Sequence, residues 1–139
     1  MVSKTTAVIP HDLTVEDWRG LLSTFPNALL IGPSEAAARV IEALLPQLQL
    51  PVCRCTGTAL ALPENARGTL IIEDVAALSR AEQERLLGWL LEPGRLTQVV
   101  ATSPSAVFPR VVNGAFLDVL YYRLNVMSFT LGSAAGRSA

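Results

Sequence analysis

The chain has 139 residues, half of them hydrophobic, and a formal net charge of −1. This length suits one domain with a buried core, and the scattered Lys and Arg residues exclude the basic face that direct nucleic-acid binding needs. Charged residues or prolines interrupt every apolar run before it could cross a bilayer, and the amino terminus lacks a signal-peptide core, so we expect no membrane contact and a cytoplasmic location.

The first expected element is a short amphipathic helix. Thr14 is a suitable cap for it, and Glu16 and Asp17 fall in its first turn, where acidic residues interact well with the helix dipole. The residues expected to face inward are Trp18, Leu21, Leu22 and Phe25. We therefore expect residues 1–26 to form a helical segment packed on the main domain.

A strand, a helix and a second strand are expected next. Residues 28–31 form a short apolar run that predicts the first strand, and Ser34 is positioned to cap the helix that follows. Pro46 is expected to end this helix early. Residues 52–55 predict the second strand.

The clearest unit of the chain begins at Thr69. Residues 69–72 are branched and apolar, as in a strand buried on both faces, and Glu73 and Asp74 follow at its carboxyl end. Ser79 and Glu82 form a capping box that opens a helix. The apolar face expected for this helix consists of Leu86, Leu87, Leu90 and Leu91. Because ligands of open parallel sheets bind beyond the carboxyl ends of the strands, the two acids are candidate site residues.

The last third of the chain predicts two more strands, at residues 98–102 and 126–131. Ser103-Pro104 is a typical helix start, although Pro109 should cut that segment short. A further helix is expected after Asn113-Gly114. The residues expected on one side of it are Phe116, Val119, Leu120 and Arg123.

Five strands that alternate with helices predict a three-layer α/β domain with a mostly parallel sheet over residues 27–131. Residues 132–139 are small and polar, so we expect a disordered tail. Cys53 and Cys55 are expected to be buried, reduced thiols, since two thiols without clustered histidines make a poor zinc site. His11 is expected to be an ordinary surface residue.

Several motifs occur in a fixed order between about residues 27 and 131. They read ALLIGPSEAAARVIEALL, GTLIIEDVAALS, AEQERLLGWLLE, TQVVATSPSAV and NGAFLDVLYYRLNV. This collinear set resembles the sigma-54-dependent transcription activators, which are hexameric ATPases of the AAA+ superfamily, and the YYRLNV match is the most specific. The resemblance implies a P-loop NTPase-like AAA+ core with strand order 5-1-4-3-2.

The phosphate-binding loop departs from the pattern of that family. Gly32 and Ser34 match it, but Glu35 and Ala37 replace the inner glycines and Ala38 replaces the lysine. A working loop needs bare backbone amides around the phosphates and a lysine on the outer ones. We therefore expect an ordinary strand–turn–helix here and no bound cofactor.

The other family residues are only partly matched. The Walker B acids occur in reversed order, as Glu73 and Asp74, which would misplace a metal or a water by about an ångström. Ser103 replaces the sensor asparagine, Leu117 replaces the first arginine finger, and Arg123 matches the second. We therefore expect no catalysis and no metal site.

Whole segments of the family are also unmatched. The stretch between the second and third strands lacks the sigma-contacting GAFTGA loop, and the helical lid and the helix-turn-helix domain have no counterpart in the sequence given.

Three functions remain as hypotheses. The first is a degenerate, nucleotide-inactive relative of the activators that regulates transcription through protein contacts, with an intact AAA+ activator or another copy of itself as the partner. The second is a true ATP- and Mg-binding domain with a relaxed loop. The third is an adaptor unrelated to transcription, because a fold does not fix a function.

Overall fold

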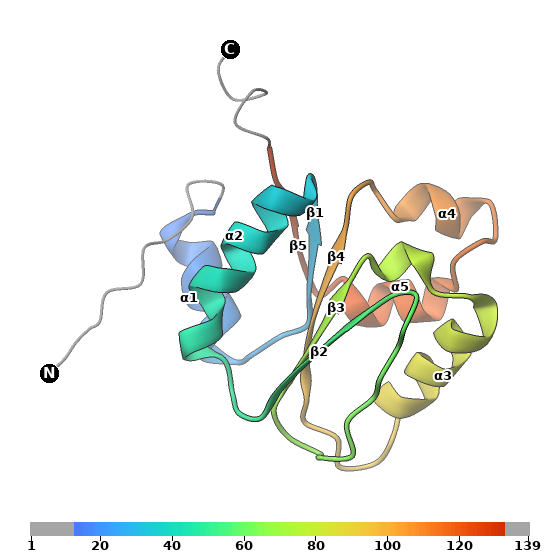
Figure 1. Ribbon diagram of the computed structural model, residues 1–139, viewed down its shortest axis with the longest axis horizontal. Coiled ribbons are helices and arrows are strands. Elements are labelled where there is room, and N and C mark those ends of the chain that lie inside the picture. The colour runs from blue at the N-terminus through green and yellow to red at the C-terminus, as the bar shows by residue number, and fades with distance from the viewer. Residues whose placement is uncertain (1–12, 133–139) are drawn as a thin grey trace, which may run out of the picture.

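The computed structural model describes residues 13–132 and shows a three-layer α/β arrangement (Figure 1). The central sheet has five strands in the order β2-β3-β4-β1-β5, and every neighbouring pair is parallel. The expected strand order is therefore confirmed. The strands are β1 (Ala28–Ile31), β2 (Val52–Thr56), β3 (Thr69–Glu73), β4 (Gln98–Ser103) and β5 (Met127–Thr130).

Helices cover both faces of this sheet (Figure 1). Side chains of α1 and α2 pack into one core cluster, and side chains of α3 and α5 pack into the other, on the opposite face. The helical segments are α1 (Val15–Ser23), α2 (Ser34–Leu44), η1 (Leu45–Gln47), η2 (Val75–Ala77), α3 (Arg80–Leu90), α4 (Phe108–Val112) and α5 (Asp118–Leu124).

β3 shows why the central strands are apolar throughout. Ile71 belongs to the cluster beneath α1 and α2, whereas Leu70 and Ile72 belong to the cluster beneath α3 and α5. All three side chains are fully buried. Because successive side chains of a strand point to opposite faces, a strand covered on both sides must be apolar at every position.

α1 begins with the predicted cap. The side chain of Thr14 accepts from the backbone N–H of Asp17 at 3.0 Å, and the carboxylate of Asp17 accepts from the N–H of Thr14 at 3.1 Å. Trp18 and Leu21 are buried as expected, whereas Leu22 and Phe25 are only partly buried. The expectations for residues 1–12, His11 among them, and for all of the tail except Gly132 lie outside the described residues.

Several predicted boundaries need correction. Ser34 does not cap α2: it is the first residue of the helix, and the preceding Pro33 offers no side-chain cap. Pro46 lies in η1, directly after α2, so the expected early end is confirmed. The helix expected at Ser103-Pro104 begins only at Phe108. Pro109 lies in the first turn of α4 instead of ending it, because proline fits the first turn of a helix.

The buried faces of α3 and α5 also differ from the predictions. In α3 the buried residues are Gln83, Leu86 and Trp89, while Leu91 lies beyond the helix and is 48 % exposed. Gln83 is buried because its side-chain nitrogen donates to the carbonyls of Leu78 and Ala115, contacts that an apolar pattern cannot predict. In α5 the buried residues are Leu120 and Leu124, and Val119 and Arg123 are exposed.

Among the residues that the structure describes, no helix has both the length and the apolar character required to span a membrane.

Candidate functional site

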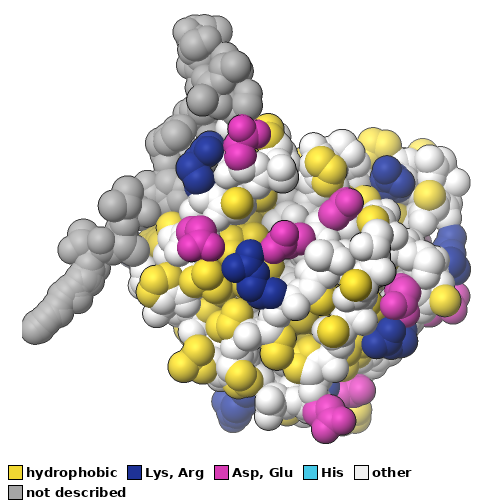
Figure 2. Space-filling model, viewed as in Figure 1, with side chains coloured by type: hydrophobic (Ala, Val, Ile, Leu, Met, Phe, Trp, Pro, Cys, Tyr) yellow, Lys and Arg dark blue, Asp and Glu magenta, His cyan; other side chains and the backbone are white. Residues whose placement is uncertain are grey.

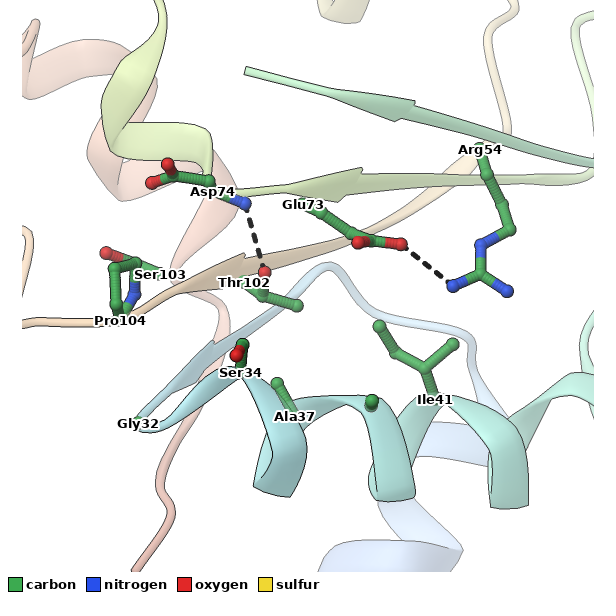
Figure 3. Close-up of a pocket in the computed structure, with 11 residues that line it drawn as sticks. Gly32, Ser34, Ala37, Ile41, Arg54, Glu73, Asp74, Thr102, Ser103 and Pro104 are labelled. Atoms are coloured by element: carbon green, nitrogen blue, oxygen red, sulfur yellow. Dashed lines mark hydrogen bonds and ion pairs between the residues drawn. The ribbon is translucent and has the colours of Figure 1, made fainter. Parts of the chain in front are cut away.

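A pocket of about 340 Å³ opens beyond the carboxyl ends of β1, β3 and β4, beside the first turns of α2 (Figure 3). This is the position at which open α/β sheets bind ligands. The pocket brings together most of the predicted site residues but not Arg123. Its lining consists of Gly32, Ser34, Ala37, Ala38, Ile41, Arg54, Glu73, Asp74, Thr102, Ser103 and Pro104.

The connection from β1 to α2 is only two residues long, Gly32 and Pro33. The backbone N–H of Gly32 donates to the carbonyl of Ser103 at 2.9 Å, so this amide is already engaged by β4. Gly32 has a φ of +152°, and a Cβ there would lie 2.4 Å from the carbonyl oxygen of Leu131. Glycine is therefore required at this position by the close approach of the chain after β5, independently of any ligand.

The first turn of α2 takes up the residues that align with the phosphate-binding loop. Ser34 and Glu35 are exposed helical residues, and the N–H of Ala37 donates to the carbonyl of Pro33 at 3.0 Å within the helix. Ala38 lines the pocket with a methyl group, where the family pattern has a lysine. No residue of this turn supplies a positive side chain to the pocket.

Glu73 is paired with a cation of the protein itself. Arg54, on β2, donates from Nη2 to Oε2 of Glu73 at 2.8 Å, and its Nη1 lies 3.9 Å from Oε2 of Glu42 on α2. The strand register explains the contact, because Glu73 lies directly opposite Thr56, so Arg54 reaches it diagonally on the same face of the sheet. The side chains of Arg54 and Glu73 are nearly half exposed, so the pair lies at the pocket entrance.

Asp74 turns away from Glu73. Its backbone is left-handed (φ 59°, ψ 59°), and its N–H donates to Oγ1 of Thr102 at 3.1 Å. In Figure 3 the carboxylate of Glu73 points toward Arg54, whereas that of Asp74 points in a different direction. The two acids do not converge on one point, and within residues 13–132 no cluster of three or more potential metal ligands occurs.

Ser103, the sensor-like residue, is buried at the end of β4. Its hydroxyl donates to the carbonyl of Ser105 at 2.6 Å, and its own carbonyl accepts from Gly32. The side chain therefore stabilises the turn that follows β4.

Arg123 is exposed on α5 and does not line the pocket. Its backbone carbonyl accepts from Nδ2 of Asn27 at 2.9 Å, which fastens the end of α5 to the start of β1. Within the described part of the chain, the side chain of Arg123 forms no ion pair with Asp118 or Glu73. Glu73 is paired with Arg54, and the carboxylate of Asp118 accepts from the N–H of Val119.

Sequence reasoning missed Arg54 and Thr102. Arg54 carried a usable signal, because it is a charged residue in the middle of a predicted strand, and the expected strand order placed that strand beside the one that ends at Glu73. Thr102 carried none, since a threonine near the end of a buried strand is common. Its role depends on the left-handed turn at Asp74.

The two cysteines on β2 are free, as expected, but they are only partly buried, whereas buried thiols were predicted. Burial raises the pKa of the Cys55 thiol above its ordinary value. A backbone hydrogen bond with Ala61 lowers this pKa in part, and the nearby Cys53 and Glu73 raise it further. The thiol is therefore less nucleophilic at neutral pH than an exposed one.

Comparison with known families gives one match over most of the chain. The family described as the sigma-54 interaction domain matches residues 28–133. No curated protein matches the chain.

Solved structures with the same fold include NtrX from Brucella abortus in complex with ATP, which is 19% identical with a TM-score of 0.69. The NtrX complex with ADP is 16% identical with a TM-score of 0.68. Each comparison covers 86% of this chain but only 36% and 34% of the NtrX chains, so the chain spans about a third of their length.

A third structure is that of the P-loop NTPase domain of a protein described as the sigma-54 transport activator from E. coli. It is 13% identical with a TM-score of 0.56, and the comparison covers 81% of this chain and 94% of that domain. At these identities the likeness concerns the fold, which is the P-loop NTPase-like α/β fold.

Proposed function

Because the chain belongs to the sigma-54 interaction domain family, we propose that it is a regulatory module of that family which binds no nucleotide productively and acts through protein contacts. The observation that carries this proposal is the two-residue connection between β1 and α2. A P-loop surrounds the phosphates with the amides of a glycine-rich loop that precedes its helix. Here the corresponding residues are the first turns of α2 itself.

Charge at the pocket supports the same conclusion. A nucleoside triphosphate needs several positive partners. Among residues 13–132, the only cationic side chain that lines this pocket is Arg54, which is already paired with Glu73. Ala38 supplies no charge, and Glu35 adds a negative one in the first turn of α2. Binding ATP would therefore require breaking an ion pair and placing phosphates near a carboxylate.

The arrangement of the acids argues against catalysis. A Walker B pair must direct one carboxylate to Mg²⁺ and the next to the attacking water, and misplacement of about an ångström costs roughly 10²-fold in rate. Glu73 and Asp74 instead diverge (Figure 3).

Thermal unfolding with and without Mg-ATP tests the proposal. A ligand present at 100 times its dissociation constant stabilises a folded protein by about 2.7 kcal/mol, which raises the melting temperature by several degrees. We expect no rise with 1 mM Mg-ATP. A rise of several degrees would favour the alternative, an ATP-binding domain with a relaxed loop, as the ATP and ADP complexes of NtrX suggest.

Arg123 supports a more specific form of the proposal. It matches the second arginine finger, a residue that in the family acts on the neighbouring subunit, and it is exposed and free of any ion pair within the described residues. A subunit that binds no nucleotide can present Arg123 to a neighbouring intact activator and interrupt the ATPase cycle of the activator's ring.

Co-expression with an intact activator, followed by the ATPase rate of the purified complex, tests this form. We expect Arg123→Ala to associate with the activator as the wild type does, but to change the activator's ATPase rate by a different amount. Equal rates with the two proteins, or no association, would remove the trans-acting role and favour an adaptor unrelated to transcription.

A further inference from the structure

β2 is an edge strand of the sheet and is drawn in front of β3 in Figure 1. The register and the flanking bonds show which of its backbone groups point outward. Thr69 donates to the carbonyl of Pro51, and Gly57 donates to the carbonyl of Glu73, so the odd-numbered residues of this stretch bond to β3. In a parallel pair the alternate residues then point away from the sheet.

The free part of this edge is short. The outward residues are Val52, Arg54 and Thr56, and the carbonyl of Thr56 accepts from the N–H of Ala59. In the other direction, β2 begins at Val52, and the carbonyl of the preceding Pro51 bonds to β3. Val52 and Arg54 therefore carry the free groups, and within the described residues their N–H and C=O groups make no hydrogen bond outside the sheet.

These four groups are complementary to themselves. If a second copy places its β2 antiparallel to the first, with Cys53 opposite Cys53, the N–H of each Val52 meets the carbonyl of the other copy's Arg54. The N–H of each Arg54 likewise meets the carbonyl of the other copy's Val52. Antiparallel residue pairs exchange both bonds in this way, and the pair between them makes none.

The surroundings of the strand suit this arrangement. Figure 2 views the molecule from the side on which β2 lies, and hydrophobic side chains there surround a small group of charged ones. Arg54 would lie opposite Val52 of the other copy, and its charge is already neutralised by Glu73. Pro51 would lie opposite Cys55 at a position that needs no N–H, so proline does not obstruct the pairing.

We infer that β2 is a self-association edge, at which two copies of this chain join their sheets by antiparallel pairing of Val52–Arg54 about Cys53. The free edge is too short to favour a long extended peptide of another protein, whereas a two-fold pair uses every free group. Four hydrogen bonds and a narrow contact make a weak, concentration-dependent dimer. This inference depends on the sheet edge and not on the pocket. The proposed function can therefore be wrong while this inference holds, and the reverse is also true.

Two variants of one residue test the inference. Arg54→Ala and Arg54→Pro both remove the ion pair with Glu73, but only proline removes the outward N–H, which makes no bond in the monomer. Sedimentation should show wild-type dimers at a few hundred micromolar, retained by Arg54→Ala and weakened at least tenfold by Arg54→Pro. A wild type that stays monomeric, or equal association of the two variants, would overturn the inference.

Cross-linking gives a second readout that does not depend on the proline variant. In the proposed dimer the two Cys53 Cα atoms lie about 4.5 Å apart, within the range that a disulfide spans. Diamide should therefore oxidise the two thiols to an intermolecular disulfide in the wild type and in Cys55→Ser. The proposed register would be contradicted if Cys53→Ser cross-linked at the wild-type rate. It would also be contradicted if the wild type formed no intermolecular disulfide.

Discussion

Arg54 and Glu73 form an ion pair between two side chains that line the pocket. Because both side chains are nearly half exposed, their attraction is screened by water and should contribute less than about 1 kcal/mol. We expect a double-mutant cycle of Arg54→Ala and Glu73→Gln, measured by urea unfolding, to give a coupling free energy below that value and to shrink with added salt. A coupling of several kcal/mol would mean that the pair is a structural requirement of the fold.

Gly57 shows how tightly the end of β3 is packed. A Cβ at this position would lie 2.0 Å from the carbonyl oxygen of Asp74, a backbone atom that cannot move freely. Gly57→Ala should therefore lower the free energy of unfolding by about 1–3 kcal/mol. Gly88→Ala is the matched control, since Gly88 lies in α3 with no atom within 4 Å, and alanine there should stabilise by about 0.5–1 kcal/mol. Equal effects of the two changes would disprove this account of the turn.

Cys55 predicts a pH dependence of stability. Because its pKa is raised in the folded protein, mainly by burial, the folded state binds the thiol proton more tightly than the unfolded chain does. This stabilising contribution is present below the ordinary thiol pKa and is lost as the pH rises through the raised one. The free energy of unfolding, measured with urea, should therefore fall less in Cys55→Ser than in the wild type between neutral and strongly alkaline pH. The same alkaline loss in both proteins would contradict the assignment.

At the scale of elements, the connection from β2 to β3 lies against the domain. Trp89 donates to the carbonyl of Pro63 at 2.9 Å, and Arg95 donates to that of Asn65 at 2.8 Å. Leu60 is buried in the core beneath α3. A segment fastened in this way offers no projecting loop to contact sigma-54.

We therefore expect the purified protein to open no sigma-54 promoter in an open-complex assay with ATP. An intact activator should do so under the same conditions. ATP-dependent opening by this chain alone would show that another surface replaces the sigma-contacting loop.

The sequence predicted the strands well, because a strand such as β3 is buried on both faces and must be apolar throughout. The helices that lie partly in solvent were less predictable. α4 has five residues and begins at a Phe-Pro pair, so it has too few turns to show a period, and its start depends on how the chain leaves β4. At the pocket, the loss of glycines and of lysine was visible in the sequence, but the direction of each carboxylate was not. That direction depends on the left-handed backbone of Asp74 and on Arg54 from a neighbouring strand.

At the scale of the whole molecule, the chain has the fold of the sigma-54 interaction domain family, and the proposed function is that its pocket does not bind nucleotide productively. The sheet order and the likeness to the NtrX structures show the P-loop NTPase-like α/β fold. The two-residue strand-to-helix turn, the diverging acids and the internal ion pair all lie at the pocket of this fold. Under the proposed function, such a molecule presents protein-binding surfaces of the family without using the pocket for catalysis.

Isothermal titration calorimetry with Mg-ATP tests this central claim most directly. The experiment uses the full chain at about 50 µM, Mg-ATP up to several millimolar, and the ATP-binding NtrX from Brucella abortus as the positive control. We predict saturable heat for NtrX and none for this chain beyond dilution. A saturable isotherm with a micromolar dissociation constant would contradict the account and would show that the two-residue turn and Arg54 rearrange to bind the nucleotide.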